Sequence, residues 1–125
     1  MGIPDMHLPI QYAILDGVRE KYPLEPLDFR KISEITFKNP DMDTFKGLPL
    51  ALHAGKTGGS LPTVFNAANE TAVRGFVKED IKFLQIYDII EAAMENHSVI
   101  KNPSLDEILE TEKETHRFIE SRFGI

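Results

Sequence analysis

Cysteine is absent from this 125-residue sequence, which excludes a disulfide framework and thiolate chemistry. Basic residues are also scarce, because 14 Lys and Arg stand against 20 Asp and Glu and leave a formal net charge of −6 at pH 7. This balance disfavours a nucleic-acid-binding domain, since such a domain needs a basic stripe that follows the phosphate backbone. The apolar runs are too short to cross a membrane, and the first residues lack the basic start and apolar stretch of a secretion signal.

The sequence does contain enough apolar side chains for a folded core. Hydrophobic residues make up 42% and charged residues 27% of the chain, which is typical of a globular domain that folds without metal or disulfide support. No internal repeat of fixed period and no low-complexity tract is visible.

The first 41 residues predict a short helix and one short strand. Residues 9–18 place apolar side chains at helical spacing after Pro9, which favours a helix with proline in its first turn. Residues 35–37 are β-branched and aromatic and precede the turn pair Asn39-Pro40, which favours a strand. A single strand needs partners along its edges, so we expect residues 1–41 to belong to something larger.

Residues 42–125 predict a mainly α domain that resembles a four-helix bundle. Helical patterns cover about 43–56, 60–78 and 86–96, and a fourth helix follows Ser104. Each helix is too short to be stable alone, so the apolar stripes are expected to pack against one another.

Local signals set the expected ends of these helices. Pro49 puts the start of the first helix in question, and the glycines at 58 and 59 end it. Ser60 is the expected N-cap of the second helix. The fourth helix begins with a capping box, in which Ser104 and Glu107 satisfy each other's free backbone N–H groups.

Neither a metal cluster nor a phosphate loop emerges from the motifs. The residues at 112, 116 and 120 are Glu, His and Glu on one helical face, but exposed charge pairing accounts for them as well as a metal does. The glycine-rich segment 55–60 lacks the first glycine of the nucleotide-binding spacing and follows a predicted helix instead of a strand. We interpret it as a helix end, a turn and the next cap.

Two asparagines interrupt the apolar stripe of the second helix. Asn66 and Asn69, with Glu70 beside them, occupy helix-interior positions that asparagine disfavours. We expect both amides to face inward and to hydrogen-bond a neighbouring loop or helix end, because buried amides are normally satisfied.

Five stretches together resemble the carboxy-terminal part of the 1-deoxy-D-xylulose 5-phosphate reductoisomerase family, whose members depend on NADPH and a divalent metal. The string Asn66-Ala67-Ala68-Asn69-Glu70 before an apolar helix is the most distinctive. The matching stretches are Pro4-Asp5-Met6, Pro9-Ile10-Gln11-Tyr12-Ala13, Leu27-Asp28-Phe29, Ile35-Thr36-Phe37 and the segment from Leu61 to Val73.

The resemblance implies that residues 1–41 end the catalytic α/β domain and that residues 42–125 form the C-terminal helical domain. The parent enzyme would convert 1-deoxy-D-xylulose 5-phosphate to 2-C-methyl-D-erythritol 4-phosphate in the non-mevalonate isoprenoid pathway, with NADPH and Mg or Mn as cofactors. The upstream dinucleotide-binding and catalytic domains are the implied partners, in a homodimer located in the bacterial cytoplasm or, in a plant, in the plastid. The resemblance implies neither a membrane nor a nucleic acid as a partner.

The resemblance also implies roles for single residues. Pro4 and Met6 match the positions that flank the nicotinamide ring of NADPH, while no catalytic residue and no metal ligand can be carried onto this chain. Asn66, Asn69 and Glu70 would have a structural role near the domain junction. The chain alone is expected to be inactive, and the alternative is an autonomous helical module for protein interaction.

Overall fold

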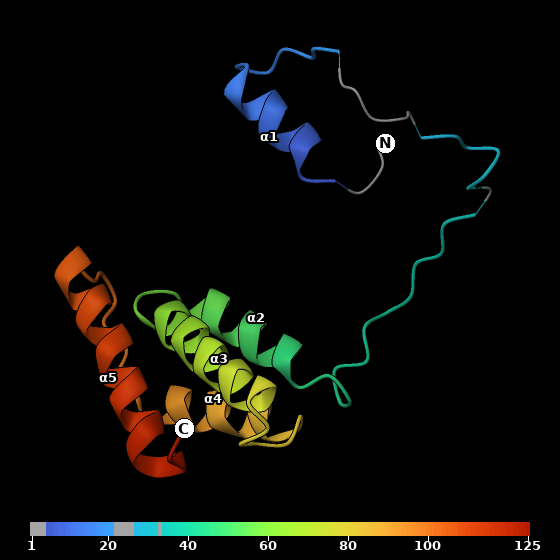
Figure 1. Ribbon diagram of the computed structural model, residues 1–125. Coiled ribbons are helices and arrows are strands. Elements are labelled where there is room, and N and C mark those ends of the chain that lie inside the picture. Colours follow the sequence, from blue (N-terminus) through green and yellow to red (C-terminus); the bar gives the residue numbers. More distant parts are fainter. Residues whose placement is uncertain (1–4, 22–26, 33) are drawn as a thin grey trace. The chain divides into compact units, whose positions relative to one another are not determined.

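The computed structural model describes residues 5–21, 27–32 and 34–125. Its helices are α1 (His7–Ile14), α2 (Gly47–Thr57), α3 (Leu61–Val77), α4 (Gln85–Asn96) and α5 (Leu105–Phe123) (Figure 1). The chain divides into two compact units, Met1–Asn39 and Pro40–Ile125. None of the helices in the described ranges is long and apolar enough to span a membrane.

In the first unit, α1 is shorter than predicted. The helix ends at Ile14 because the backbone turns at Asp16 and Gly17, which both have positive φ angles of 50° and 81°. The Gly17 N–H donates to the Tyr12 carbonyl at 2.9 Å, which closes this turn.

The predicted strand at residues 35–37 is not confirmed. These residues are exposed, and no strand is present in the described part of the chain. The physical reason is that a strand is defined by its partner, and the described residues offer no second strand to pair with this segment. The mainly α character of the chain is confirmed.

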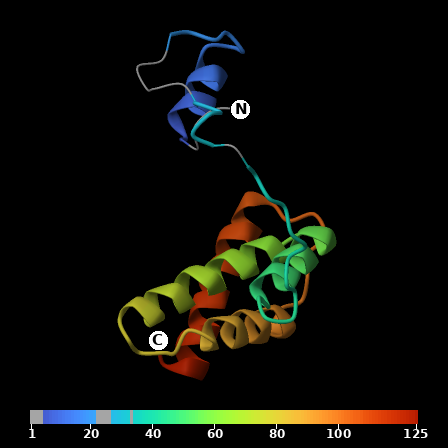
Figure 2. The same cartoon turned by 90° about the vertical axis from the view of Figure 1, so that its right-hand side faces the viewer.

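In the second unit, α3 is the central helix and contacts each of the other three (Figure 2). Most side chains on its buried face are small. The buried residues are Leu61, Val64, Ala67, Ala68, Thr71, Ala72 and Gly75. The neighbouring helices supply larger aliphatic groups, of which Ile89, Ile90 and Ile119 are almost fully buried. The predicted packing of four helices around one apolar core is confirmed.

The bounds of α2 differ from the prediction because a turn precedes the helix. The Asp41 carboxylate accepts hydrogen bonds from the backbone N–H groups of Asp43 (3.1 Å) and Thr44 (2.9 Å). The helix therefore starts at Gly47, and Pro49 falls in its first turn, where a missing N–H costs nothing.

The start of α5 agrees with the prediction. The Ser104 hydroxyl accepts the Glu107 N–H at 3.3 Å, and the Glu107 carboxylate accepts the Ser104 N–H at 2.7 Å. The Ser104 hydroxyl also donates to the Glu107 carboxylate, at 2.8 Å. The hydrogen bonds that this carboxylate accepts from the Ser104 N–H and hydroxyl lower its pKa, because they favour the charged form. The capping box is present as predicted.

The start of α3 does not agree. Ser60 precedes the helix, but its side chain makes no capping hydrogen bond. Its backbone N–H donates to the Ile100 carbonyl at 3.0 Å instead. Gly59 lies against the same carbonyl, with a φ of 60°, so close that a Cβ atom there would be 2.3 Å from the Ile100 oxygen. Gly58 therefore ends α2, whereas Gly59 makes a close contact with the α4–α5 connection.

Candidate functional site

Met6, the predicted nicotinamide contact, stands directly before α1, and 70% of the residue's surface is exposed. The Asp5 carboxylate accepts the His7 N–H at 2.7 Å and lies 2.6 Å from the imidazole Nδ1 of His7. This turn fixes the backbone on both sides of Met6 and leaves its thioether accessible. Pro4, the second predicted contact, lies outside the described residues.

A cavity of about 520 Å³ is formed by α1 and the segment that follows it. Tyr12 and the turn at Gly17 are part of its wall, and Arg19 adds a cationic group. The full lining consists of Leu8, Pro9, Gln11, Tyr12, Gly17, Val18 and Arg19.

The asparagines of α3 do not form the predicted inward pair. Asn66 is exposed, and its amide Nδ2 donates to the Glu70 carboxylate at 3.2 Å, one helical turn further on. Asn69 is half-buried. The expectation that both amides face inward is wrong for Asn66, because an i,i+4 pair at the surface satisfies the amide without burial.

The sequence pattern placed His116 on one helical face with Glu112 and Glu120, but the hydrogen-bond partner of its ring lies on α3. Its Nδ1 lies 2.8 Å from the buried Thr71 hydroxyl oxygen, which also accepts from the Arg74 guanidinium at 3.1 Å. The Glu112 carboxylate is 3.9 Å from His116 Nε2. Within the described ranges, no three His, Cys, Asp or Glu side chains are grouped so that they could hold a metal ion.

Sequence reasoning missed the pairing of Ser60 with His97. The Ser60 side chain is fully buried, and its Oγ lies 2.7 Å from His97 Nε2. The same Oγ accepts the Ile100 N–H at 2.9 Å. Burial lowers the pKa of His97, and the charge of Glu114 opposes this shift. The two side chains are 37 positions apart, so no local motif could have revealed the pair.

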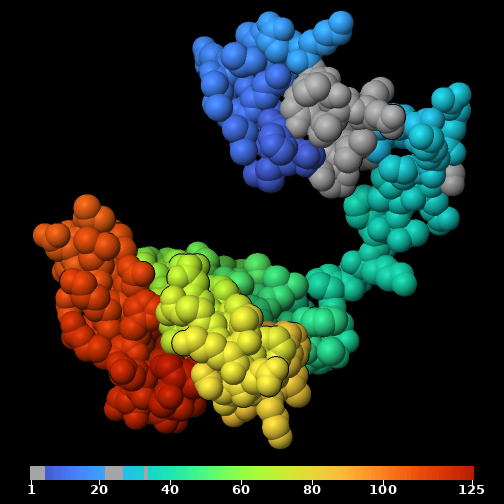
Figure 3. Space-filling view, in the orientation of Figure 1, coloured from blue at the N-terminus to red at the C-terminus, as the bar shows by residue number. Residues whose placement is uncertain are grey.

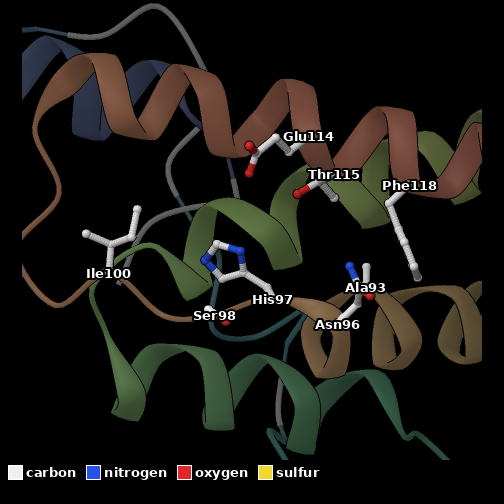
Figure 4. A pocket seen from close by; sticks show the side chains of 8 residues that line it. All are labelled: Ala93, Asn96, His97, Ser98, Ile100, Glu114, Thr115 and Phe118. Carbon is white, nitrogen blue, oxygen red and sulfur yellow. The ribbon is translucent and has the colours of Figure 1, made fainter.

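His97 borders a cavity of about 290 Å³ between the end of α4 and α5 (Figure 4). Glu114 and Thr115 line it from α5, together with Phe118, and Ile100 lines it from the connection between the two helices.

An aromatic cluster lies where α3 ends and α4 begins. The rings of Phe76 and Phe83 are 5.7 Å apart, and those of Phe83 and Tyr87 are 5.8 Å apart, both in edge-to-face geometry. Phe83 is 53% and Phe76 39% exposed. Figure 3 shows this part of the second unit, in yellow, at the surface of the molecule.

The second unit is an all-α domain built around a central helix of mostly small buried residues. Comparisons with known proteins show to which family the chain belongs. The family model of the DXP reductoisomerase C-terminal domain matches residues 1–118. The chain therefore belongs to the 1-deoxy-D-xylulose 5-phosphate reductoisomerase family, as the resemblance indicated.

Curated relatives in this family are similar over almost the whole chain. The reductoisomerase of Agathobacter rectalis is 52% identical over 98% of this chain and 32% of its own length. The reductoisomerase of a Geobacillus species is 49% identical over 97% of this chain and, again, 32% of its own length. The chain thus spans about one third of the relatives that it matches.

Solved structures of the family share the fold. The reductoisomerase of Zymomonas mobilis, solved in complex with NADPH, has a TM-score of 0.89 and 34% identity, and it covers 98% of this chain and 32% of its own. A second reductoisomerase, solved with fosmidomycin and magnesium, also has a TM-score of 0.89, at 28% identity, and covers 99% of this chain and 33% of its own.

Proposed function

We propose that this chain is the C-terminal part of an NADPH- and divalent-metal-dependent reductoisomerase that converts 1-deoxy-D-xylulose 5-phosphate to 2-C-methyl-D-erythritol 4-phosphate. The match of the family model to residues 1–118 carries the proposal. In the parent enzyme, bound NADPH supplies the hydride. The remaining substrate, cofactor and metal contacts would come from the upstream dinucleotide-binding and catalytic domains. The parent enzyme would be a homodimer in the bacterial cytoplasm or, in a plant, in the plastid.

Residues 1–41 would end the catalytic domain and contribute Pro4 and Met6 to the nicotinamide pocket. The exposed thioether of Met6 suits this role, because sulfur makes favourable contacts with a flat aromatic ring and excludes water from the hydride path. The described residues fit no metal site, so the metal ligands of the parent enzyme would lie upstream.

Residues 42–125 would support the catalytic domain structurally. The exposed Asn66–Glu70 pair on the outer face of α3 is available to hydrogen-bond backbone groups of that domain, with the half-buried Asn69 beside it. The exposed aromatic cluster of Phe76 and Phe83 is an apolar surface that the upstream domains of the same enzyme would cover.

A chimeric enzyme tests this function. This chain would replace the last third of the Agathobacter rectalis reductoisomerase, with the unaltered enzyme as the positive control. We expect NADPH oxidation that requires both 1-deoxy-D-xylulose 5-phosphate and a divalent metal. A chimera that folds, as judged by circular dichroism, but consumes no NADPH would contradict the proposal and favour the autonomous helical module.

The same chimera tests the role of Met6. Met6→Ala should raise the KM for NADPH or lower kcat, because the nicotinamide ring loses one wall of its pocket. Glu20→Ala, an exposed change in the same unit, is the matched control and should leave both constants unchanged. Equal kinetic constants in all three chimeras would remove Met6 from the cofactor site.

The 125-residue chain alone is expected to be inactive. Two residues of a pocket wall cannot replace the phosphate and ribose contacts that a dinucleotide needs, so calorimetry should detect no micromolar binding of NADPH. A micromolar Kd would show that the chain holds a larger part of the cofactor site than the family resemblance implies.

A further inference from the structure

Gly59, Ser60, His97 and Ile100 form what we call the Ser60–His97 junction. The positions of the Ser60 hydroxyl hydrogen and of the His97 ring hydrogen follow from the contacts there. The Ser60 oxygen accepts the Ile100 N–H, so its own hydroxyl hydrogen needs an acceptor, and a hydroxyl with no exposed surface must find it away from bulk solvent. His97 Nε2, at 2.7 Å, is the acceptor when the imidazole is neutral with its proton on Nδ1.

Protonation of His97 would disturb this arrangement. A protonated imidazole carries hydrogen on both ring nitrogens, so Nε2 would become a donor facing a hydroxyl. The Ser60 hydroxyl hydrogen, which has no exposed surface around it, would then lose its acceptor, and this loss has a free-energy cost. The rigid neighbourhood prevents an easy rearrangement, because Gly59 is already in close contact with the Ile100 carbonyl.

The surroundings of His97 offer the protonated ring another partner. Among the described residues that line the cavity, Glu114 on α5 is the titratable group that faces His97. The remaining lining residues are uncharged, both on α4 and on α5, and the start of α3 contributes only the Ser60 hydroxyl. Neutral His97 is thus held by Ser60, whereas a cationic ring is attracted by Glu114.

We propose that the Ser60–His97 junction is a protonation-dependent contact that fastens the start of α3 to the α4–α5 connection. With neutral His97, the serine joins the two segments through both its backbone and its hydroxyl. With cationic His97, the ring leaves Ser60 for Glu114, and the connection around Ile100 opens while the helical core remains folded. The lowered pKa of His97 is consistent with a folded state that favours the neutral ring.

The sign of the pH dependence follows from linkage. A folded-state pKa below the ordinary value of 6.5 means that the closed junction binds fewer protons than the open one. The junction is therefore fully closed above pH 6.5 and opens as the pH falls through the folded-state pKa. The opening constant should rise at least tenfold for each unit by which the His97 pKa lies below about 6.5, because Glu114 also favours the cationic ring in the open state.

Amide hydrogen exchange and NMR titration of the full chain test the proposal. The His97 pKa should lie below 6.5, and the protection factor of the Ile100 amide, corrected for intrinsic exchange, should fall between about pH 7.5 and about pH 5 by at least the factor that this pKa requires. Protection in the core of α3, at Ala68 and Ala72, should not change in parallel. Equal loss in the core and at Ile100 would overturn the local opening.

Three variants sharpen the test. His97→Gln keeps a polar side chain without titration and should make Ile100 protection independent of pH, whereas His53→Gln, on the exposed face of α2, should behave as the unaltered chain. Glu114→Gln removes the charge that favours the cation and should move the opening to lower pH. A pH dependence that persists in His97→Gln, or a His97 pKa at or above 6.5, would refute the proposal.

Discussion

Replacement of Gly59 by alanine should destabilise the chain by far more than an ordinary surface substitution. The residue has a φ of 60°, and the left-handed conformation costs a residue with a Cβ atom about 1–2 kcal/mol. The new Cβ would also stand 2.3 Å from the Ile100 carbonyl oxygen, which is backbone and cannot rotate away.

Relief of this clash requires the two segments to move apart. Such a movement would break the hydrogen bonds from Ser60 N–H to the Ile100 carbonyl and from Ile100 N–H to Ser60 Oγ. Each is worth about 0.5–1.5 kcal/mol in net stability. Together with the backbone strain, the expected loss in free energy of unfolding for Gly59→Ala is about 2–5 kcal/mol.

Urea unfolding at about pH 7.5, followed by far-ultraviolet circular dichroism, measures this loss. Gly124→Ala is the control for strain alone, because Gly124 has a φ of 70° but a Cβ atom there would meet no other atom within 4 Å. Gly55→Ala, in the ordinary helical conformation of α2, should instead stabilise the chain by about 0.5–1 kcal/mol. If Gly59→Ala lost no more stability than Gly124→Ala, the close contact with Ile100 would be refuted.

Three further predictions concern the second unit. Ser104→Ala should cost about 1 kcal/mol in urea unfolding through loss of the N-cap. An NMR titration should show only a partial rise in the pKa of Glu107, because the hydroxyl hydrogen bond to its carboxylate is lost while the backbone N–H of residue 104 can still donate. In the unaltered chain, the stabilisation that comes from ionised Glu107 is present above pH 4.5 and is lost as the pH falls through the lowered pKa; a Glu107 pKa at or above 4.5 would contradict this. Ile119→Ala should cost about 2–5 kcal/mol, because it leaves a cavity at a side chain with no exposed surface; a loss below about 1 kcal/mol would mean that the core collapses around the site. Asn66→Ala should change the unfolding free energy of the isolated chain by less than about 0.5 kcal/mol, since the amide is exposed; a loss above about 1 kcal/mol would mean that the amide has a buried partner.

The helices of residues 40–125 could be predicted because their signals are local. Apolar spacing identifies each stripe, and the capping box at Ser104 places the start of α5. The strand at 35–37 could not be settled in this way, because a strand depends on a partner that periodicity in one segment does not provide.

The candidate site was harder to predict than the fold. The Asn66–Glu70 hydrogen bond follows an i,i+4 spacing that is visible in the sequence, yet the stripe pattern alone favoured burial. The pairing of Ser60 with His97 joins segments 37 residues apart, and serine before a helix is normally interpreted as a cap. Only the folded arrangement shows that this hydroxyl serves a different segment.

The small residues on the buried face of α3 also determine how the centre of the second unit can move. Ala67, Ala68 and Ala72 have no side-chain torsions, and Gly75 has no side chain at all, so folding costs them almost no rotamer entropy. At these four positions, α3 therefore has no alternative rotamers through which the neighbouring helices could shift. Fluctuations of the unit are therefore expected at its connections and outer faces, while the axis of α3 stays fixed.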